Sequence, residues 1–200
     1  MDALQFHIGS FALERRLSLR HMFSSERIRL RAFEPGDLPE QHAMVNDEET
    51  ALAMTRGMPY PSSMEDERQW LSQQSSYTHG EYQFAIESRL TGDLIGRCGV
   101  TRLDWKNRVG EMAIMVGKAY QGQGLGTEAM QLLCSFCFRQ LNLHRLKMSV
   151  LKTNAAAIRC YEKCGFQEEG ILREEVFRNG RYVDVVLMGR LCREEDLLDT

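Results

Sequence analysis

A short glycine-rich segment is the part of this sequence best suited to chemistry. It consists of Gln121, Gly122, Gln123, Gly124, Leu125, Gly126 and Thr127. The segment follows a strand-like apolar run and opens a run with helical periodicity. Several backbone N–H groups can therefore converge on an anion at the positive end of a helix. This pattern predicts a binding site for the phosphates of a ligand.

Other kinds of glycine-rich turn must be weighed against this one. A dinucleotide-binding turn requires G-x-G-x-x-G and an acidic residue about 20 residues later, but the third glycine is missing here. A P-loop ends in a lysine, and no lysine follows the last glycine of this segment. Both nucleotide interpretations are disfavoured, and a plain strand-to-helix turn stays as the alternative.

A second segment, Asn154 to Phe166, has the sequence NAAAIRCYEKCGF. Together the two segments resemble the QxxGxG loop and the Asn-x-x-Ala-x-x-x-Tyr-x-x-x-Gly-Phe motif of the GNAT superfamily of N-acetyltransferases. The resemblance extends from about Arg27 to Leu191 and is strongest to the branch of spermidine and ribosomal-protein alanine N-acetyltransferases. It implies an enzyme that moves an acetyl group from acetyl-CoA to a primary amine by direct attack, without a metal ion.

The resemblance also implies an α+β architecture, the acyl-CoA N-acyltransferase fold. Its sheet is mainly antiparallel and twisted, is flanked by helices, and has a splayed central strand pair. The strand Glu111 to Val116 would bulge and separate from the strand Leu146 to Val150, which opens a V-shaped slot for the pantetheine arm. Because an arm rich in amides can pair with a free strand edge, the backbone of Ile114, Met115 and Val116 is expected to bind it. The glycine-rich segment would wrap the pyrophosphate.

Two residues of the second segment have implied roles. The amide of Asn154 would hydrogen-bond to the pantetheine or to the adjacent backbone, although an asparagine at the start of a helix is also a good N-cap. The hydroxyl of Tyr161 would lie beside the thioester sulfur and protonate the leaving thiolate as a general acid. The alternative for Tyr161 is a core position, because Ala157, Ile158 and Tyr161 fit one apolar stripe of a helix.

Glu111 is predicted to be the general base. In related enzymes an acid at this position deprotonates the amine, usually through water. Discharging an alkyl amine with a pKa of about 10.4 costs roughly 4 to 5 kcal/mol at neutral pH, whereas an α-amine near 7.8 requires only about 1, so a polyamine demands the stronger base. The alternative is a surface carboxylate paired with an arginine such as Arg108. Backbone N–H groups at the bulge around Met115 would stabilise the oxyanion.

The identity of the amine acceptor stays open. The family places the acceptor between the loop that joins the first two helices and the terminal hairpin, here Asn46 to Pro61 and Arg173 to Tyr182. Acidic residues at 47–49 and 65–67 and the NGRY sequence favour a polyamine, although solvated helix ends also explain the acidic residues. The segment Met54 to Pro61 suits an extended protein N-terminus equally well. A non-catalytic acyl-CoA sensor of the same fold is the competing class, and the intact catalytic residues argue against it.

Apolar periodicity and turn signals predict the elements that position these residues. Strands are expected at 27–32, 83–87, 93–103, 108–116 and 146–150, and Asn179-Gly180 predicts a terminal β-hairpin. Helices are expected at 37–47, at 64–74, from the glycine cluster through Cys137, and at 155–164. Capping boxes are expected at Asp37 with Glu40, at Ser62 with Glu65 and at Ser63 with Asp66. The three strands between 83 and 116 should form an antiparallel meander.

The composition favours one globular domain with a single active site. With 200 residues and 43% apolar content, we expect an extension at 1–25, the N-acetyltransferase domain at 26–193 and a tail at 194–200. A net charge of −3 disfavours nucleic-acid binding, and no run approaches the roughly 20 apolar residues that span a bilayer. We therefore expect a cytoplasmic protein, with acetyl-CoA and an amine as its partners and a homodimer as a further possibility.

The six cysteines do not form a disulfide pattern. They lie mostly within helix-like or strand-like runs, so we interpret them as reduced core thiols. Cys134 and Cys137 form a CxxC, but no second ligand pair follows at the spacing of a zinc site. Cys160 and Cys164 give only one helical i,i+4 pair, so no metal site is predicted.

Overall fold

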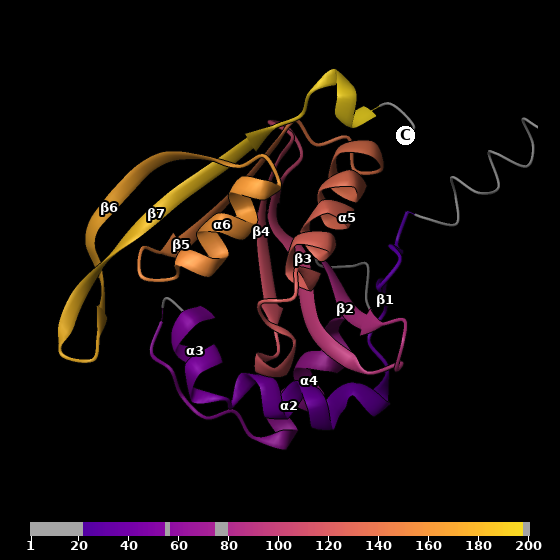
Figure 1. Cartoon of the computed structure of the whole chain (residues 1–200), viewed down its shortest axis with the longest axis vertical. Coiled ribbons are helices and arrows are strands. Elements are labelled where there is room, and N and C mark those ends of the chain that lie inside the picture. Colours follow the sequence, from indigo (N-terminus) through magenta and orange to yellow (C-terminus); the bar gives the residue numbers. More distant parts are fainter. Residues whose placement is uncertain (1–21, 55–56, 75–79, 198–200) are drawn as a thin grey trace, which may run out of the picture.

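The computed structural model describes residues 22–54, 57–74 and 80–197 (Figure 1). The strands are β1 (Ile28–Arg31), β2 (Tyr82–Ser88), β3 (Leu94–Asp104), β4 (Val109–Val116), β5 (Arg145–Leu151), β6 (Gln167–Arg178) and β7 (Arg181–Leu191). The α-helices are α2 (Leu38–Val45), α3 (Glu48–Met54), α4 (Met64–Gln74), α5 (Leu125–Arg139) and α6 (Ala155–Lys163). Short 3-10 helices lie at Pro35–Asp37, Lys118–Tyr120 and Glu194–Leu197. Helix α3 was not anticipated from the sequence.

A seven-stranded sheet with the order β1-β2-β3-β4-β5-β7-β6 organises the chain. All neighbouring strands are antiparallel except β4 and β5, which are parallel. The predicted meander of β2, β3 and β4 is therefore confirmed, as is the mainly antiparallel α+β architecture. In Figure 1, α5 and α6 cover the upper part of the sheet, whereas α2, α3 and α4 gather at its lower end.

Two apolar cores lie on opposite faces of the sheet, because successive side chains of a strand point to opposite faces. In β4, Ile114 belongs to the larger core, which it shares with the buried stripe of α5. The next residue, Met115, belongs to a smaller core with Met44 of α2. The alternation of β4 thus anchors helices on both faces and holds this strand in place.

The long β6–β7 hairpin projects beyond the rest of the sheet (Figure 1). Its turn residues Asn179 and Gly180 both have positive φ, at 49° and 79°. These values are what a two-residue Asn-Gly turn requires, so the predicted hairpin is confirmed. A third apolar cluster, which includes Leu151, Val176 and Val185, holds the hairpin to β5.

The three expected capping boxes have different outcomes. The box of Ser62 with Glu65 is wrong, because Ser62 Oγ donates to Glu67 at 2.6 Å and the Ser62 N–H donates to Asn46 at 2.8 Å. At the start of α4, Ser63 Oγ accepts from the Asp66 N–H and Asp66 accepts from the Ser63 N–H, both at 3.1 Å, which confirms that box. The box at Asp37 and Glu40 is wrong. The Asp37 carboxylate instead accepts from both terminal nitrogens of Arg31 at 2.7 Å and caps the preceding 3-10 turn. An ion pair with a residue six positions earlier has replaced the capping interaction that the sequence suggested.

Both ends of the described chain pack onto the domain. The ring of Phe23 lies 5.5 Å from the rings of Phe84 and Phe136, and Asp196 accepts hydrogen bonds from Arg190 and the Arg193 N–H. The predicted extension at 1–25 lies mostly outside the described residues, and the domain boundaries stay predictions. Within the described ranges, no helix combines the length and apolar character needed to cross a membrane.

The main core predicts a large cost for truncating Leu133 on α5. This side chain is 0% exposed, so Leu133→Ala should lower the free energy of unfolding by about 2–5 kcal/mol, measured by urea denaturation. Leu90→Ala provides a matched control, because Leu90 is 93% exposed and its truncation should change stability by less than about 0.5 kcal/mol. Equal effects of the two changes would contradict the assigned core.

Candidate functional site

The separation of β4 from β5 creates the site. The two strands pair only from Val109 with Arg145 to Glu111 with Lys147. Beyond that point β5 continues along β7, whereas β4 continues along β3 as far as Val116. Within the described residues, one edge of β4 between Met112 and Val116 therefore has no strand partner. The predicted splayed pair is present.

The expected bulge within Glu111 to Val116 is wrong for the pairing of β4 with β3. The register is continuous from Thr101 opposite Glu111 to Gly96 opposite Val116, and the irregularity lies between Thr101 and Asp104 of β3. Arg102 there has a φ of 46°, so the extra residue belongs to β3. Beyond Glu111 and Lys147, β4 stays paired with β3 and β5 with β7, and the two strands are no longer paired with each other.

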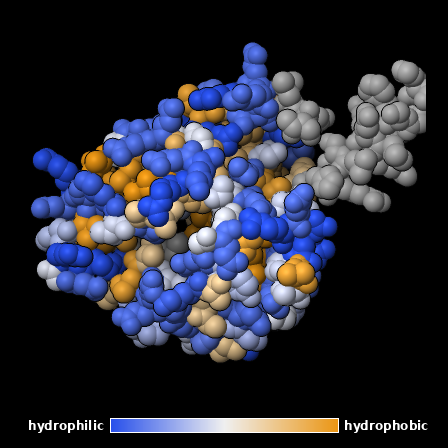
Figure 2. Space-filling view, in the orientation of Figure 1, coloured by the Kyte–Doolittle hydropathy of each residue, from blue (hydrophilic) through white to orange (hydrophobic). Residues whose placement is uncertain are grey.

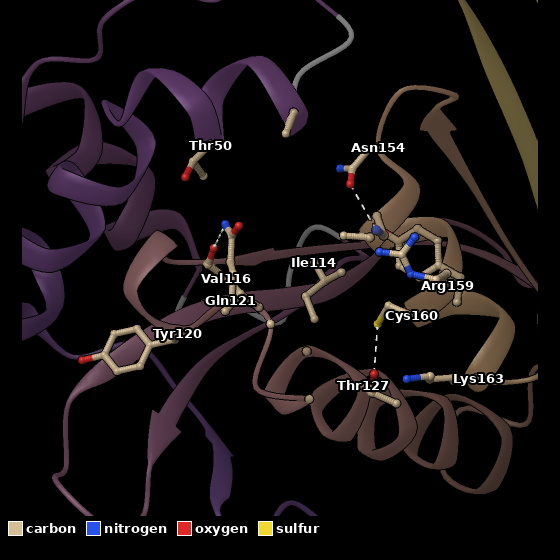
Figure 3. A pocket seen from close by; sticks show the side chains of 17 residues that line it. Thr50, Ile114, Val116, Tyr120, Gln121, Thr127, Asn154, Arg159, Cys160 and Lys163 are labelled. Atoms are coloured by element: carbon tan, nitrogen blue, oxygen red, sulfur yellow. Dashed lines mark hydrogen bonds between the residues drawn. The ribbon is translucent and has the colours of Figure 1, made fainter.

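A cavity of about 340 Å³ lies beside the divergent edge of β4. Residues of β4, the glycine-rich segment, α6 and α3 line it: Thr50, Ala53, Ile114, Val116, Tyr120, Gln121, Gly122, Gly124, Gly126, Thr127, Asn154, Ala156, Ala157, Arg159, Cys160, Tyr161 and Lys163. Figure 2 shows a hollow near the centre of this face, and Figure 3 shows the side chains around the cavity. The two sequence motifs thus meet at one cavity.

The glycine-rich segment forms a tight turn that leads into α5. Gly122 and Gly124 have φ values of 74° and 81°, a conformation that side chains with a Cβ rarely adopt. The side-chain amide of Gln121 donates to the Val116 carbonyl at 2.9 Å, and that of Gln123 donates to the Ala119 carbonyl at the same distance. Both glutamines therefore brace the turn, and its backbone is the part available to an anion.

The predicted phosphate-binding residues divide into two groups. Gln121, Gly122, Gly124, Gly126 and Thr127 line the cavity, whereas Gln123 and Leu125 do not. The Leu125 side chain packs into the main core instead. Of the three predicted pantetheine-binding residues, Ile114 and Val116 line the cavity, and the Met115 side chain packs on the opposite face.

Arg27 is a positioning residue that sequence reasoning missed. Its Nη1 donates to the Gln123 carbonyl at 2.9 Å, and its Nε donates to Glu128 Oε1 at 2.6 Å. Ser25 Oγ donates to the other oxygen of Glu128 at 2.7 Å. These contacts tie the glycine-rich turn to the start of the domain. No local pattern signals them, because the partners lie about one hundred residues apart.

Asn154 caps α6 through its side-chain oxygen, which accepts from the Ala157 N–H at 3.1 Å. The capping role is therefore present, and the amide nitrogen is the atom that could donate to a ligand. In Figure 3, Asn154 lies at the rim of the cavity, across from Thr50 of α3. The amide nitrogen of Asn154 thus points toward the side of the cavity that α3 forms.

Tyr161 both lines the cavity and packs in the main core, with 8% of the residue exposed. The core and cavity positions proposed from the sequence therefore coexist in one residue. Burial raises the pKa of the phenol well above its usual value. The hydroxyl consequently stays protonated throughout the physiological pH range and can serve as a hydrogen-bond donor.

Arg159 and Lys163 supply the positive charge of the cavity. They lie four residues apart on α6 and flank Cys160 in Figure 3. Among the described residues that line this cavity, none carries a carboxylate. The arrangement suits an anionic ligand close to the start of α5. Both cations lie inside the second sequence motif, so their i,i+4 spacing could have indicated that they share one face of a helix. Only the fold shows that this face lines the same cavity as the glycine-rich turn.

Glu111 lies where β4 and β5 part, outside the set of residues that line the cavity. Its carboxylate accepts from Arg102 Nη1 at 3.0 and 3.1 Å, and Lys147 Nζ lies 3.9 Å away. The ion pair considered from the sequence is therefore present, but with Arg102 in place of Arg108. Arg108 instead donates to Asn142. With 23% of its side chain exposed, Glu111 is open to water, and its role as base stays a prediction.

The acidic residues near the expected acceptor region mostly support the local structure. Asp47 accepts from the N–H and hydroxyl of Thr50, which lowers the pKa of the Asp47 carboxyl. Glu67 is buried and bonds to Gln41 and Ser62. Asp47 thus fits the helix-end explanation, whereas Glu67 is a buried structural carboxylate and not a solvated helix end.

Comparison with known proteins places this geometry in a family. Residues 27–167 match the GNAT acetyltransferase domain. The chain belongs to the GNAT acetyltransferase family. It is an acetyl-CoA-dependent N-acetyltransferase, and the cavity beside the splayed strands of this GNAT protein has the position and charge expected for the acyl donor.

Several relatives of this GNAT protein are spermidine acetyltransferases. The chain is 33% identical to spermidine N(1)-acetyltransferase of Vibrio cholerae over 164 residues, which cover 82% of this chain and 92% of that protein. It is 32% identical to the Escherichia coli K12 enzyme of the same name, covering 84% and 87% of the two chains. The Vibrio cholerae enzyme in complex with CoA and spermine superimposes with a TM-score of 0.75, at 31% identity, over 84% of this chain and 96% of that one. These similarities favour an enzyme over the non-catalytic sensor.

The cationic wall of the cavity yields a prediction for acetyl-CoA binding. Replacing both Arg159 and Lys163 by Gln should raise the KM for acetyl-CoA about tenfold at low ionic strength, equivalent to roughly 1.4 kcal/mol. The difference should shrink as salt screens the charges. Arg68→Gln is the matched control, because Arg68 is an exposed cation on α4 outside the cavity. An unchanged KM in the double variant at low salt would contradict the assignment.

Proposed function

We propose that this GNAT protein transfers the acetyl group of acetyl-CoA to a primary amine of a polyamine, by direct attack in a ternary complex. The observation that carries the proposal is the convergence of the divergent β4 edge, the positive end of α5 and Tyr161 on one cavity. An acyl-CoA thioester needs these three features: an amide-rich edge for its arm, an anion site for its phosphates and a proton donor for its sulfur. A cytoplasmic location and a homodimer stay predictions.

In the proposed reaction the neutral amine attacks the thioester carbonyl, and the resulting tetrahedral intermediate expels the thiolate of CoA. Glu111 accepts the proton of the ammonium group through water, since the carboxylate lies outside the cavity. Its ion pair with Arg102 must loosen as the carboxylate takes up the proton. Backbone N–H groups of the free β4 edge stabilise the oxyanion, and the Tyr161 hydroxyl protonates the departing sulfur.

The polyamine acceptor is inferred from the relatives. Two spermidine acetyltransferases are similar to this chain over more than four-fifths of its length, and one relative is known in complex with spermine. The local acidic residues contribute less to the inference, because Asp47 and Glu67 are engaged in structural hydrogen bonds. Glu48 of α3 lines a second cavity together with residues 59–62, and it is the acidic residue in the lining of that cavity.

A peptide α-amine is the second candidate acceptor. The segment at 57–63, between α3 and α4, forms neither helix nor strand, and it lies against the tip of the β6–β7 hairpin, where Asn179 lines the same second cavity. An extended segment beside a hairpin can accommodate an extended peptide. This observation keeps a protein N-terminus in consideration.

Tyr161→Phe should lower kcat by about 10²–10⁴-fold with little change in the KM for acetyl-CoA, because it removes the proton donor and keeps the packed ring. Steady-state kinetics with a polyamine acceptor measure both quantities. Tyr82→Phe is the matched control, since Tyr82 packs against Phe136 in the core away from the cavity, and its kcat should not change. A normal kcat in Tyr161→Phe would remove the tyrosine from the mechanism.

Glu111→Gln should lower kcat/KM for the amine by about 10²–10⁴-fold at neutral pH, because the ammonium group then lacks its base. The defect should diminish as the pH rises toward the amine pKa of about 10.4, where the acceptor is already neutral. Glu169→Gln is the control, as Glu169 is likewise ion-paired with an arginine, Arg145, but follows Glu168 on β6, which β5 and β7 separate from β4 in the sheet, and does not line the cavity. A rate equal to that of the unmodified enzyme at every pH would show that Glu111 is not the base.

The acceptor is tested by comparing kcat/KM for spermidine, spermine, free amino acids, amino sugars and peptides that begin with Ala or Ser. We expect spermidine or spermine to give the highest value. A peptide with the highest value would support the second candidate and reject the polyamine proposal. Tight CoA binding without transfer to any acceptor would reject the enzymatic function itself.

A further inference from the structure

Two thiols and a hydroxyl form a cluster in the wall of the acetyl-CoA cavity. Cys160 of α6 lines the cavity, and its sulfur accepts from the Thr127 hydroxyl of α5 at 3.5 Å. The Cys164 sulfur, one helical turn further on, lies 3.6 Å from the Thr127 carbonyl oxygen. Figure 3 shows the sulfur of Cys160 directed at Thr127, between the side chains of Arg159 and Lys163. The catalytic steps proposed above use neither cysteine.

This environment favours the thiolate form of Cys160. Hydrogen bonds from Cys164 and Thr127 and the charge of Lys163 lower the pKa of the Cys160 thiol, even though partial burial opposes the shift. The first turn of α5 adds the positive end of a helix, which also stabilises a thiolate. A thiolate at this position is both nucleophilic and exposed to the cavity.

The other five cysteines lie in environments that hold them as thiols. Burial raises the pKa of Cys98, Cys134, Cys137 and Cys192. The hydrogen bond to Cys160, together with burial, raises the pKa of Cys164. Reactivity follows thiolate character and access, so Cys160 is set apart from the rest.

We propose that Cys160 is a site of covalent modification by small anionic disulfides, and that the adduct excludes acetyl-CoA. The Cys160 thiolate attacks one sulfur of the disulfide, a new S–S bond forms to Sγ, and the original S–S bond breaks. The second sulfur leaves as a thiolate with the electron pair, so Cys160 is oxidised to the mixed disulfide while the reagent is reduced by the same two electrons. A free thiol reverses the step by the same exchange.

The position of Cys160 explains why the adduct would compete with the cofactor. Its sulfur lies 4.0 Å from the place that a Cβ on Gly126 would occupy, directly beside the glycine-rich turn. An adduct the size of glutathione would fill a cavity of about 340 Å³ at the point where the phosphates of acetyl-CoA are proposed to bind. Arg159 and Lys163, which favour those phosphates, would likewise favour the carboxylates of glutathione. The inference therefore rests on the proposed cofactor site.

The test exposes the full-length protein to oxidised glutathione at pH 7, with and without saturating desulfo-CoA, a cofactor analogue that has no thiol. Peptide mass spectrometry locates the modified cysteines, and acetyl transfer is assayed in parallel. We expect Cys160 to be modified roughly tenfold faster than Cys192, because an ordinary thiol is only about 3% thiolate at pH 7. Desulfo-CoA should suppress the modification, activity should fall in proportion to it, and dithiothreitol should restore activity.

Two variants separate the thiols. Cys160→Ser should lose the desulfo-CoA-sensitive inactivation, measured against its own untreated activity, whereas Cys192→Ser should retain it. Cys192 is a matched control because it too is partly exposed but lies outside the cavity. Peptide mass spectrometry on the protein without substitutions identifies the modified cysteine even when a variant folds poorly.

The outcomes distinguish this inference from the function on which it rests. Modification confined to Cys192, modification of Cys160 at the same rate with desulfo-CoA bound, or modification without loss of acetyl-CoA binding would each overturn it. Calorimetry with desulfo-CoA provides the separation. An absence of binding heat would overturn the proposed cofactor site as well, whereas normal heat with unprotected Cys160 would overturn the thiol proposal alone.

Discussion

The site depends on the incomplete pairing of β5 with one of its two neighbours. It pairs with β7 along its full length, from Arg145 to Leu151, but with β4 only as far as Lys147. The remainder of β4 keeps one free edge in the interior of a sheet, where unpaired backbone groups are costly. Such an edge is tolerated at a place where a ligand can supply the missing hydrogen bonds. The strand arrangement and the binding of an amide-rich arm are thus two aspects of one constraint.

Helices α5 and α6 complete what the strands begin. The turn before α5 needs positive φ at Gly122 and Gly124, and it is braced by its own glutamine side chains and by Arg27. Helix α6 and its cap bring Asn154, two cations, a buried phenol and the Cys160 thiol to the same wall within ten residues. Because so many residues of the site lie on this short helix, its sequence alone indicates the family.

The parts of the fold that the sequence predicted are those governed by local physics. Alternating apolar residues located the strands, Asn179 and Gly180 located the hairpin turn, and Ser63 located the start of α4, because each pattern acts over a few residues. The parts that the sequence analysis missed depend on side-chain partners that no spacing rule specifies, whether six, nine or 96 residues away. Asp37 left its expected capping role for Arg31, Glu111 paired with Arg102, and Arg27 reached Gln123, and none of these contacts has a local signature. The position of the cavity could be predicted, but the electrostatic surroundings of its residues could not.

Thr50 and Ala53 of α3 lie on one side of the cavity, and the residues of α6 lie on the other. Helix α3 is attached to the cavity region by the contact of Glu49 with Lys118 at 2.6 Å, an exposed ion pair of small strength. A bound cofactor would contact both sides and hold together α3 and α6, which are remote in the chain. Binding of the cofactor would then raise the melting temperature. A ligand at one hundred times its Kd adds about 2.7 kcal/mol to the free energy of unfolding. The melting temperature of this protein in a cell would accordingly follow the supply of its acyl donor.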